Sequence, residues 1–306
     1  MILTTVTLEG GVDAALALVP AAPGVGQILA AEDRNLVIGR PSNLRRWVAG
    51  HLGRARPPKV VAGRIPPRPP TDLTPIAVAI GYVRTQSAFG QRLAFERVMA
   101  RYVPLAKRRD LKRPAWLRVD GDAPLPRILV QPGPAGTHVF GPFRDSRAAT
   151  RARDALDKHF RIRPCDFGFK PPVGVPAGLA EQITRALAAG AEIVEIPPWV
   201  QPPYGRSLIA EDVKGHLEVY PVAGGAVLEE GMLDTGVDGL EPAIAGIDWT
   251  APLPPRDDVP WLNSWRHGKH SGVEVRLRDD EPASAIAARI REVLGGDGAA
   301  VGAVVG

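Results

Sequence analysis

The stretch PGVGQILAAEDRNLVIGRPSNLRR, residues 23–46, carries the clearest local pattern in this chain. Two short apolar runs, residues 25–29 and 35–38, are separated by the polar segment Ala31-Glu32-Asp33-Arg34. Two apolar runs joined by a short polar segment are typical of two antiparallel strands and their turn. The stretch therefore predicts a β-hairpin.

A short helix is predicted directly after the hairpin. Gly39 ends the second strand, and Ser42 or Asn43 supplies a side chain that can accept hydrogen bonds from the first free N–H groups of a helix. Three apolar residues then recur at a spacing of four, namely Leu44, Val48 and Leu52. This spacing indicates one buried face of a helix that continues to Leu52.

Working outward, the same patterns predict further elements in the first half of the chain. Strands are expected over residues 1–7, 76–83, 115–119 and 127–131, and helices over residues 89–102 and 145–160. Pro104 ends the first of these helices, because proline lacks the N–H that a helix needs. Residues 54–75 hold seven prolines and are predicted to form an extended loop.

The composition is that of a globular protein of about two domains. The chain has 306 residues, of which 45% are apolar and 23% charged, and its single Cys excludes a disulfide scaffold or an all-cysteine metal site. The longest uncharged stretch, residues 14–31, is interrupted by Pro and Gly and follows no basic residue. We therefore expect a cytoplasmic protein without a membrane segment.

Charge is distributed unevenly along the chain. Residues 1–170 hold 28 Lys/Arg and 13 Asp/Glu, whereas residues 171–306 hold 10 and 20. A net charge of +15 in the first half and −10 in the second indicates two modules. The basic module has the charge expected of one that binds a polyanion.

The second half predicts a small α+β domain. Strands are expected over residues 193–196, 216–222, 226–228 and 273–277. Helices are expected around Leu179, Ile183 and Leu187 and again from Pro282 to Gly295. The predicted fold class is α+β throughout.

Three segments within residues 23–46 resemble the opening of a GIY-YIG nuclease domain of the UvrC type. They are Pro23-Gly24-Val25-Gly26, Val37-Ile38-Gly39-Arg40 and Asn43-Leu44-Arg45-Arg46, beside the family's P-G-[IV]-Y, Y-[IV]-G-K and N-L followed by basic residues. Later landmarks of the series are Thr85-Gln86-Ser87, Gly141-Pro142-Phe143 and Arg163-Pro164-Cys165.

The resemblance covers about residues 15–167 and implies a domain organisation. Residues 1–104 are expected to form a GIY-YIG-like antiparallel sheet flanked by helices, and residues 105–170 a basic UvrC-like extension. Residues 171–306 are then an acidic α+β domain, in which the later nuclease domain of the family is not recognisable.

The resemblance also implies which positions carry phosphodiester cleavage, and all four are substituted here. The two hairpin tyrosines fall on Gly26 and Val37, the helix arginine on Trp47, and the metal-binding glutamate on Phe95. None of these side chains can supply the hydroxyl, guanidinium or carboxylate that the role requires.

Two neighbours are the candidates that could compensate, Arg46 for the arginine and Glu96 for the ligand of Mg²⁺ or Mn²⁺. One residue along a helix turns a side chain by about 100°, so Glu96 is not expected to face the same site as Phe95. Glu96 is instead interpreted as a solvated helix charge and Arg46 as a surface basic residue.

Basic residues that could bind phosphate remain in three groups. The first is Arg40, Asn43, Arg45 and Arg46; the second is Lys107, Arg108, Arg109, Lys112 and Arg113; the third includes Arg147 and Arg151 on the helix at 145–160. Contacts of Lys and Arg with phosphates give a sequence-independent affinity that falls with salt. The acidic half could also cover this surface within the chain.

Three functional hypotheses follow. The first is a UvrC-like protein of DNA repair, partnered by DNA and a repair protein, that binds DNA with lost or impaired cleavage. The second is an active, metal-dependent, structure-specific endonuclease using Glu96 and Arg46. The third is a protein-interaction module acting through its acidic half. His267 and His270 are interpreted as surface residues and Cys165 as an ordinary thiol, rather than as metal ligands.

Overall fold

The chain divides into two compact units in a computed structural model, residues 1–108 and 109–306. The predicted domain boundary at 104 lies four residues before this division. The structure describes residues 3–54, 70–104, 107–108, 111, 113–120, 127–136, 138–160, 182, 205–228, 233–250, 258–268, 270–278, 281–295 and 304–305. Both units combine helices with mainly antiparallel sheets, so the fold is α+β, as predicted.

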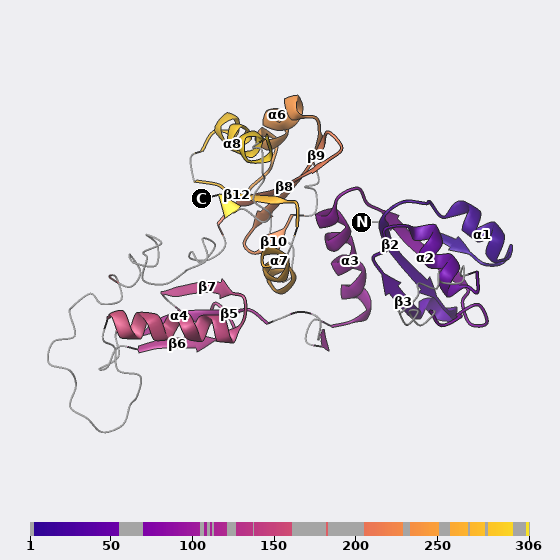
Figure 1. Ribbon diagram of the computed structural model, residues 1–306, viewed down its shortest axis with the longest axis horizontal. Coiled ribbons are helices and arrows are strands. Elements are labelled where there is room, and N and C mark those ends of the chain that lie inside the picture. Colours follow the sequence, from indigo (N-terminus) through magenta and orange to yellow (C-terminus); the bar gives the residue numbers. More distant parts are fainter. Residues whose placement is uncertain are drawn as a thin grey trace, which may run out of the picture. The chain divides into compact units, whose positions relative to one another are not determined.

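The first unit is built on a four-stranded antiparallel sheet in the order β1-β4-β2-β3 (Figure 1). Its strands are β1 (Thr4–Thr7), β2 (Gly24–Leu29), β3 (Asn35–Gly39) and β4 (Ala79–Arg84). The predicted hairpin is confirmed as β2 and β3, which a short 3-10 turn η1 (Ala31–Asp33) connects. The chain enters β4 later than expected, because Ile76 is half exposed in a turn.

One face of this sheet is covered by α1 (Val12–Leu18) and α2 (Leu44–His51). The Asn43 side chain accepts a hydrogen bond from the Arg46 backbone N–H at 2.9 Å, which confirms the predicted cap of α2. Leu44, Val48 and Leu52 are fully buried against the sheet. Helix α1 was not predicted.

The opposite face is covered by α3 (Ala88–Tyr102), as the spacing of apolar residues predicts. Ser87 caps its N-terminus by accepting from the Gly90 backbone N–H, and Ala94 and Val98 pack on Val25 of β2. Val25 and Ile28 lie three residues apart in the strand, so they point to opposite faces. The hairpin is therefore sandwiched between α2 and α3.

The second unit begins with a three-stranded antiparallel sheet in the order β6-β5-β7. Its strands are β5 (Ala115–Asp120), β6 (Arg127–Gln131) and β7 (Val139–Phe143), the last of which was not predicted. Helix α4 (Ser146–His159) is capped by Asp145 and packs Ala149, Ala152 and Leu156 on this sheet (Figure 1).

The second sheet of this unit has the order β10-β9-β8-β12-β13, with β11 pairing on β9. Its strands are β8 (Ser207–Val213), β9 (His216–Ala223), β10 (Ala226–Val227), β11 (Leu233–Thr235), β12 (Val273–Arg276) and β13 (Val304–Val305). The helical segments are η3 (Val237–Gly239), α6 (Leu240–Ala245), α7 (Val259–Arg266) and α8 (Ala283–Gly295). Helices α6 and α8 bury one face of the sheet.

Much of the acidic charge on this sheet is structural. Glu211, Glu218 and Glu274 are each at most 3% exposed, and they accept hydrogen bonds from Ser271, Tyr220 and Ser207. Glu274 also accepts two hydrogen bonds from the Arg266 guanidinium, at 2.6 and 2.7 Å. Burial alone would raise the pKa of Glu274, but the charge and hydrogen bonds of Arg266 hold it below its usual value.

Several sequence predictions fall outside the described residues. They are most of the loop at 54–75, the helix around 179–187 and the strand at 193–196. Among the helices that the structure describes, none combines the length and the apolar character needed to cross a bilayer.

Candidate nucleic-acid interface

Trp47 lies across the two strands of the hairpin. Gly26 and Gly39 are direct partners in the β2–β3 ladder. A Cβ added to Gly26 would lie 2.8 Å from Trp47 Cζ3, and one added to Gly39 would lie 2.8 Å from Cε2, Cζ2 and Nε1 of the same indole. The indole thus packs across both strands. It fits there because Gly26 and Gly39 carry no side chains.

This packing removes the space in which hairpin side chains could act. Gly26 is the position where the resemblance implies a tyrosine, and any side chain there meets the Trp47 ring. Val37, the second such position, is partly buried and packs in the same apolar cluster. On the face of the hairpin toward α2, the Trp47 indole therefore fills the space at Gly26. The second position carries only the isopropyl group of Val37.

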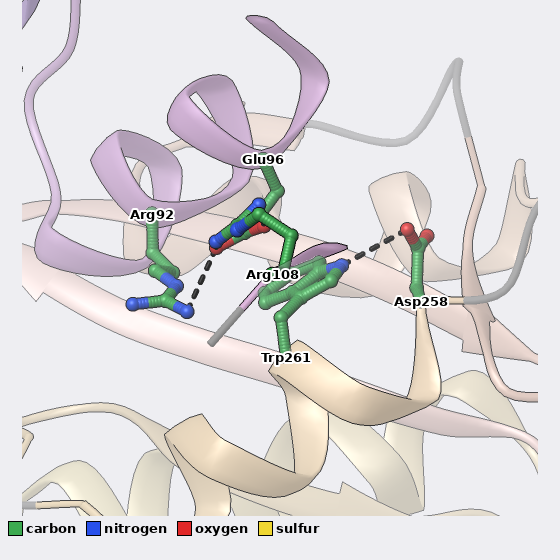
Figure 2. Close-up of polar contacts among 5 residues, drawn as sticks. All are labelled: Arg92, Glu96, Arg108, Asp258 and Trp261. Atoms are coloured by element: carbon green, nitrogen blue, oxygen red, sulfur yellow. Dashed lines mark hydrogen bonds and ion pairs between the residues drawn. The ribbon is translucent and has the colours of Figure 1, made fainter. Parts of the chain in front are cut away.

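Glu96 lies in the middle of a buried cluster of charges (Figure 2). Arg108 donates from Nη1 to Oε2 at 2.8 Å and from Nη2 to Oε1 at 3.3 Å. Arg92, one turn earlier on α3, brings Nη2 to 2.7 Å from Oε1. The Glu96 side chain is only 5% exposed, so its interpretation as a solvated helix charge is wrong.

The reason for the error is tertiary. The sequence places Glu96 one residue beyond Phe95, which predicts that the two side chains point in different directions. It does not show that the chain after α3 returns Arg108 to Glu96 from twelve residues away. Arg92 was also missed, although its i, i+4 spacing to Glu96 is a signal that the sequence contains.

These residues do not fit a divalent cation. Both oxygens of Glu96 already face guanidinium groups, and two positive charges close by oppose a third. Over the part of the chain that the structure describes, no group of three or more His, Cys, Asp or Glu side chains is arranged to hold a metal ion. We therefore derive no chemical step through a metal.

The Phe95 ring lies close to two arginine guanidinium groups, whereas the resemblance implies a metal-binding carboxylate at this position. The Arg40 guanidinium carbon lies 4.8 Å from the centre of its ring, and that of Arg108 lies 5.7 Å away. Both distances are within the range of cation–π attraction. Phe95 thus holds Arg40, which is exposed at the end of β3, in a defined place on the surface.

The four residues of the first basic group have different surroundings. The Asn43 side chain is used as the cap of α2, and the Arg45 guanidinium donates to the carbonyl oxygen of Val19 at 2.8 Å. Arg46 is exposed on the first turn of α2, and Arg40 is exposed over Phe95. Arg40 and Arg46 are thus the members of this group best placed to meet a phosphate.

The second and third groups divide in the same way. Lys107 and Arg113 are exposed, whereas the Arg108 side chain is only 4% exposed against Glu96. Arg109 and Lys112 lie outside the described residues. Arg147 and Arg151 are both exposed on α4.

The remaining candidates are structural. His270 stacks on Trp265 at 3.8 Å between ring centres, and burial lowers its pKa, which favours the neutral ring. His267 is also partly buried.

Figure 2 also shows Asp258, which accepts hydrogen bonds from Trp261 Nε1 at 2.9 Å and from the Val227 backbone N–H at 3.0 Å. Cys165 lies outside the described residues.

Comparison with known proteins finds similarity to UvrABC system protein C from several bacteria. The chain is 30% identical over 153 residues to that of Aromatoleum aromaticum, a match of 49% of this chain and 24% of the relative. It is 28% identical over 154 residues to that of Rhodospirillum rubrum, covering 50% and 23%. For Alkalilimnicola ehrlichii the identity is 26% over 170 residues, covering 54% and 26%.

The chain thus spans about a quarter of the length of the curated relatives it matches. No family model matches the chain. No solved structure matches it either. The three similarities support a UvrC-related family for about half of the chain.

Proposed function

We propose that this chain is a UvrC-related protein of nucleotide excision repair whose first unit binds DNA without cutting it. The similarity to three UvrABC system C proteins supports the repair association. The exposed Arg40, Arg46 and Lys107 support phosphate binding, because guanidinium and ammonium groups pair with phosphates independently of sequence.

The observation that carries the loss of cleavage is the state of Glu96. A carboxylate can bind a catalytic metal only if at least one oxygen is available to it. Both oxygens of Glu96 face the guanidinium groups of Arg92 and Arg108, within a cluster largely removed from water. Releasing Glu96 would take from the buried Arg108 the carboxylate that balances its charge, which is strongly unfavourable.

Arg46 and Trp47, on the other face of the hairpin, also support a loss of cleavage. Arg46 is exposed on α2, and the neighbouring Trp47 fills the space above Gly26 and Gly39. A water molecule activated between the two strands would need a group there that accepts its proton, and neither Val37 nor the indole, whose Nε1–H is only a donor, supplies one. We therefore favour binding over the alternative of an active endonuclease that uses Arg46 and Glu96.

The buried carboxylates also weigh against an interaction module based on the acidic half. Asp258, Glu211, Glu218 and Glu274 are at most 3% exposed, so these four charges are not presented to a basic partner. They account for part of the negative charge that the sequence places after residue 170.

The test is a cleavage assay on nicked, branched and ultraviolet-damaged duplexes with Mg²⁺ or Mn²⁺, run beside a binding assay on the same substrates. We expect binding and intact DNA. Cleavage by the purified chain that Glu96→Gln abolishes, with the variant still folded by circular dichroism, would restore the endonuclease hypothesis. Absence of DNA binding at low salt would overturn the proposed function itself.

A further inference from the structure

Helix α4 presents basic side chains along the face opposite to the one it buries. Ala149, Ala152 and Leu156 pack on the three-stranded sheet, and Arg147, Arg151 and Lys158 are exposed. At 100° per residue these three side chains fall within about 40° around the helix axis, on the side away from the sheet. We call Arg147, Arg151 and Lys158 the α4 ridge.

Arg153 keeps the ridge positive. Asp154 lies about 20° outside this arc, and its carboxylate is held by Arg153 at 2.6 Å. Arg153 also lies 3.7 Å from Asp157. In the described part of the chain, no ion pair engages Arg147, Arg151 or Lys158. The cation behind the ridge thus neutralises the acidic side chains, and the ridge cations remain available.

We propose that the α4 ridge is a second nucleic-acid contact, which binds the phosphates of one DNA strand. This inference rests on the proposed function and extends it from the first unit to α4 of the second, which carries Arg147 and Arg151 of the third basic group. At 1.5 Å per residue the ridge is about 16 Å long, a length over which one strand of a duplex presents about five phosphates.

The structure favours nucleic acid over two other anionic partners. A membrane-surface helix needs a free apolar face, whereas the apolar residues of α4 are buried against its own sheet. An acidic protein segment of the same length carries fewer and less regular charges than a DNA strand. The buried Glu211, Glu218 and Glu274 of the same unit are not available to cover the ridge.

The test is the salt dependence of DNA binding by the full chain, measured by fluorescence anisotropy with a labelled duplex between about 50 and 200 mM NaCl. The variant Arg147→Gln/Arg151→Gln should lower affinity about tenfold or more and reduce the slope of log affinity against log salt by about 2. Asp154→Asn, which removes a negative charge from the ridge, should raise affinity.

The matched control is Lys214→Gln/Arg278→Gln, which removes two exposed cations from the second sheet of the same unit. This control should bind like the unaltered chain. If the unaltered chain binds DNA but the ridge variant keeps its affinity and slope, the ridge inference fails and the proposed function stands. Equal losses in both variants would show only a response to net charge and would also overturn it.

An unaltered chain that binds no DNA would overturn both the inference and the proposed function. Competition by polyglutamate at the charge concentration at which DNA competes would assign the ridge to an acidic protein instead.

Discussion

Arg108 and Glu96 form a two-pronged buried ion pair, with N–O distances of 2.8 and 3.3 Å and side chains 4% and 5% exposed. The pair links the middle of α3 to the segment that follows the helix. It also occupies the carboxylate next to the position where the resemblance implies a metal ligand. Stability and the proposed loss of cleavage thus depend on the same contact.

Replacing Arg108 by Met should lower the free energy of unfolding by about 3 kcal/mol, because a buried Glu96 would lose its main partner. Urea denaturation monitored by circular dichroism measures the change. The double variant Arg108→Met/Glu96→Leu should recover most of the loss, since it leaves no unpaired carboxylate. Lys107→Gln is the control, as Lys107 is exposed and should change stability little. A single variant as stable as the unaltered chain would contradict the buried pair.

Gly26→Ala should destabilise the first unit by about 1–3 kcal/mol, because its Cβ must push the Trp47 indole off the hairpin. The added atom would start only 2.8 Å from Trp47 Cζ3. Gly50→Ala is the matched control within α2, where the nearest atom is 3.6 Å away, and it should stabilise by about 0.5–1 kcal/mol. Thermal unfolding of the two variants should therefore shift in opposite directions, and equal shifts would contradict the packing of Trp47.

DNA binding should not depend on divalent metal, because the Glu96 cluster offers arginine groups rather than a free carboxylate. Anisotropy measured in EDTA and in Mg²⁺ at matched ionic strength should give the same affinity. A requirement for Mg²⁺ would contradict the proposal of metal-free binding.

Arg40→Gln/Arg46→Gln should reduce both the affinity for DNA and its salt slope, the slope by about 2 if both residues contact phosphates. Arg34→Gln provides a control at the other end of β3, where an exposed arginine lies outside the first basic group. If Arg34→Gln changes the affinity and the slope as much as a single Arg40→Gln or Arg46→Gln variant does, the phosphate contact does not depend on Arg40 and Arg46.

Asp157 should make the second unit less stable as pH rises from about 4 to 6. Burial raises its pKa from 3.8 to about 6, against the opposing charge of Arg153. Between these values the folded chain binds a proton that the unfolded chain has lost, so stability falls with rising pH and is level above 6. Asp157→Asn should therefore stabilise at pH 7 by about 1 kcal/mol or more and have a smaller effect at pH 4. Asp154→Asn should reduce part of the effect, because the charge of Asp154 also raises the pKa of Asp157. A pH-independent gain in Asp157→Asn would contradict the shift.

Local patterns predicted the elements that frame the candidate interface. The hairpin and helices α2, α3 and α4 lie where apolar spacing and a capping side chain indicate them, and Asn43 and Asp145 cap the predicted helices. These signals are interactions between residues a few positions apart. Helix α1 and strand β7 were missed, and β7 is held by its pairing with β5 rather than by a pattern within its own segment.

The sequence by itself determined the order of the three basic groups along the chain and the α+β class. It also identified the substituted positions Gly26, Val37, Trp47 and Phe95. Only the tertiary structure decided which cations are exposed. Arg108 is buried against Glu96, while Arg40 is held in the open over Phe95. The physical reason is that charge is a property of a residue, whereas burial and pairing depend on what the folded chain brings beside it.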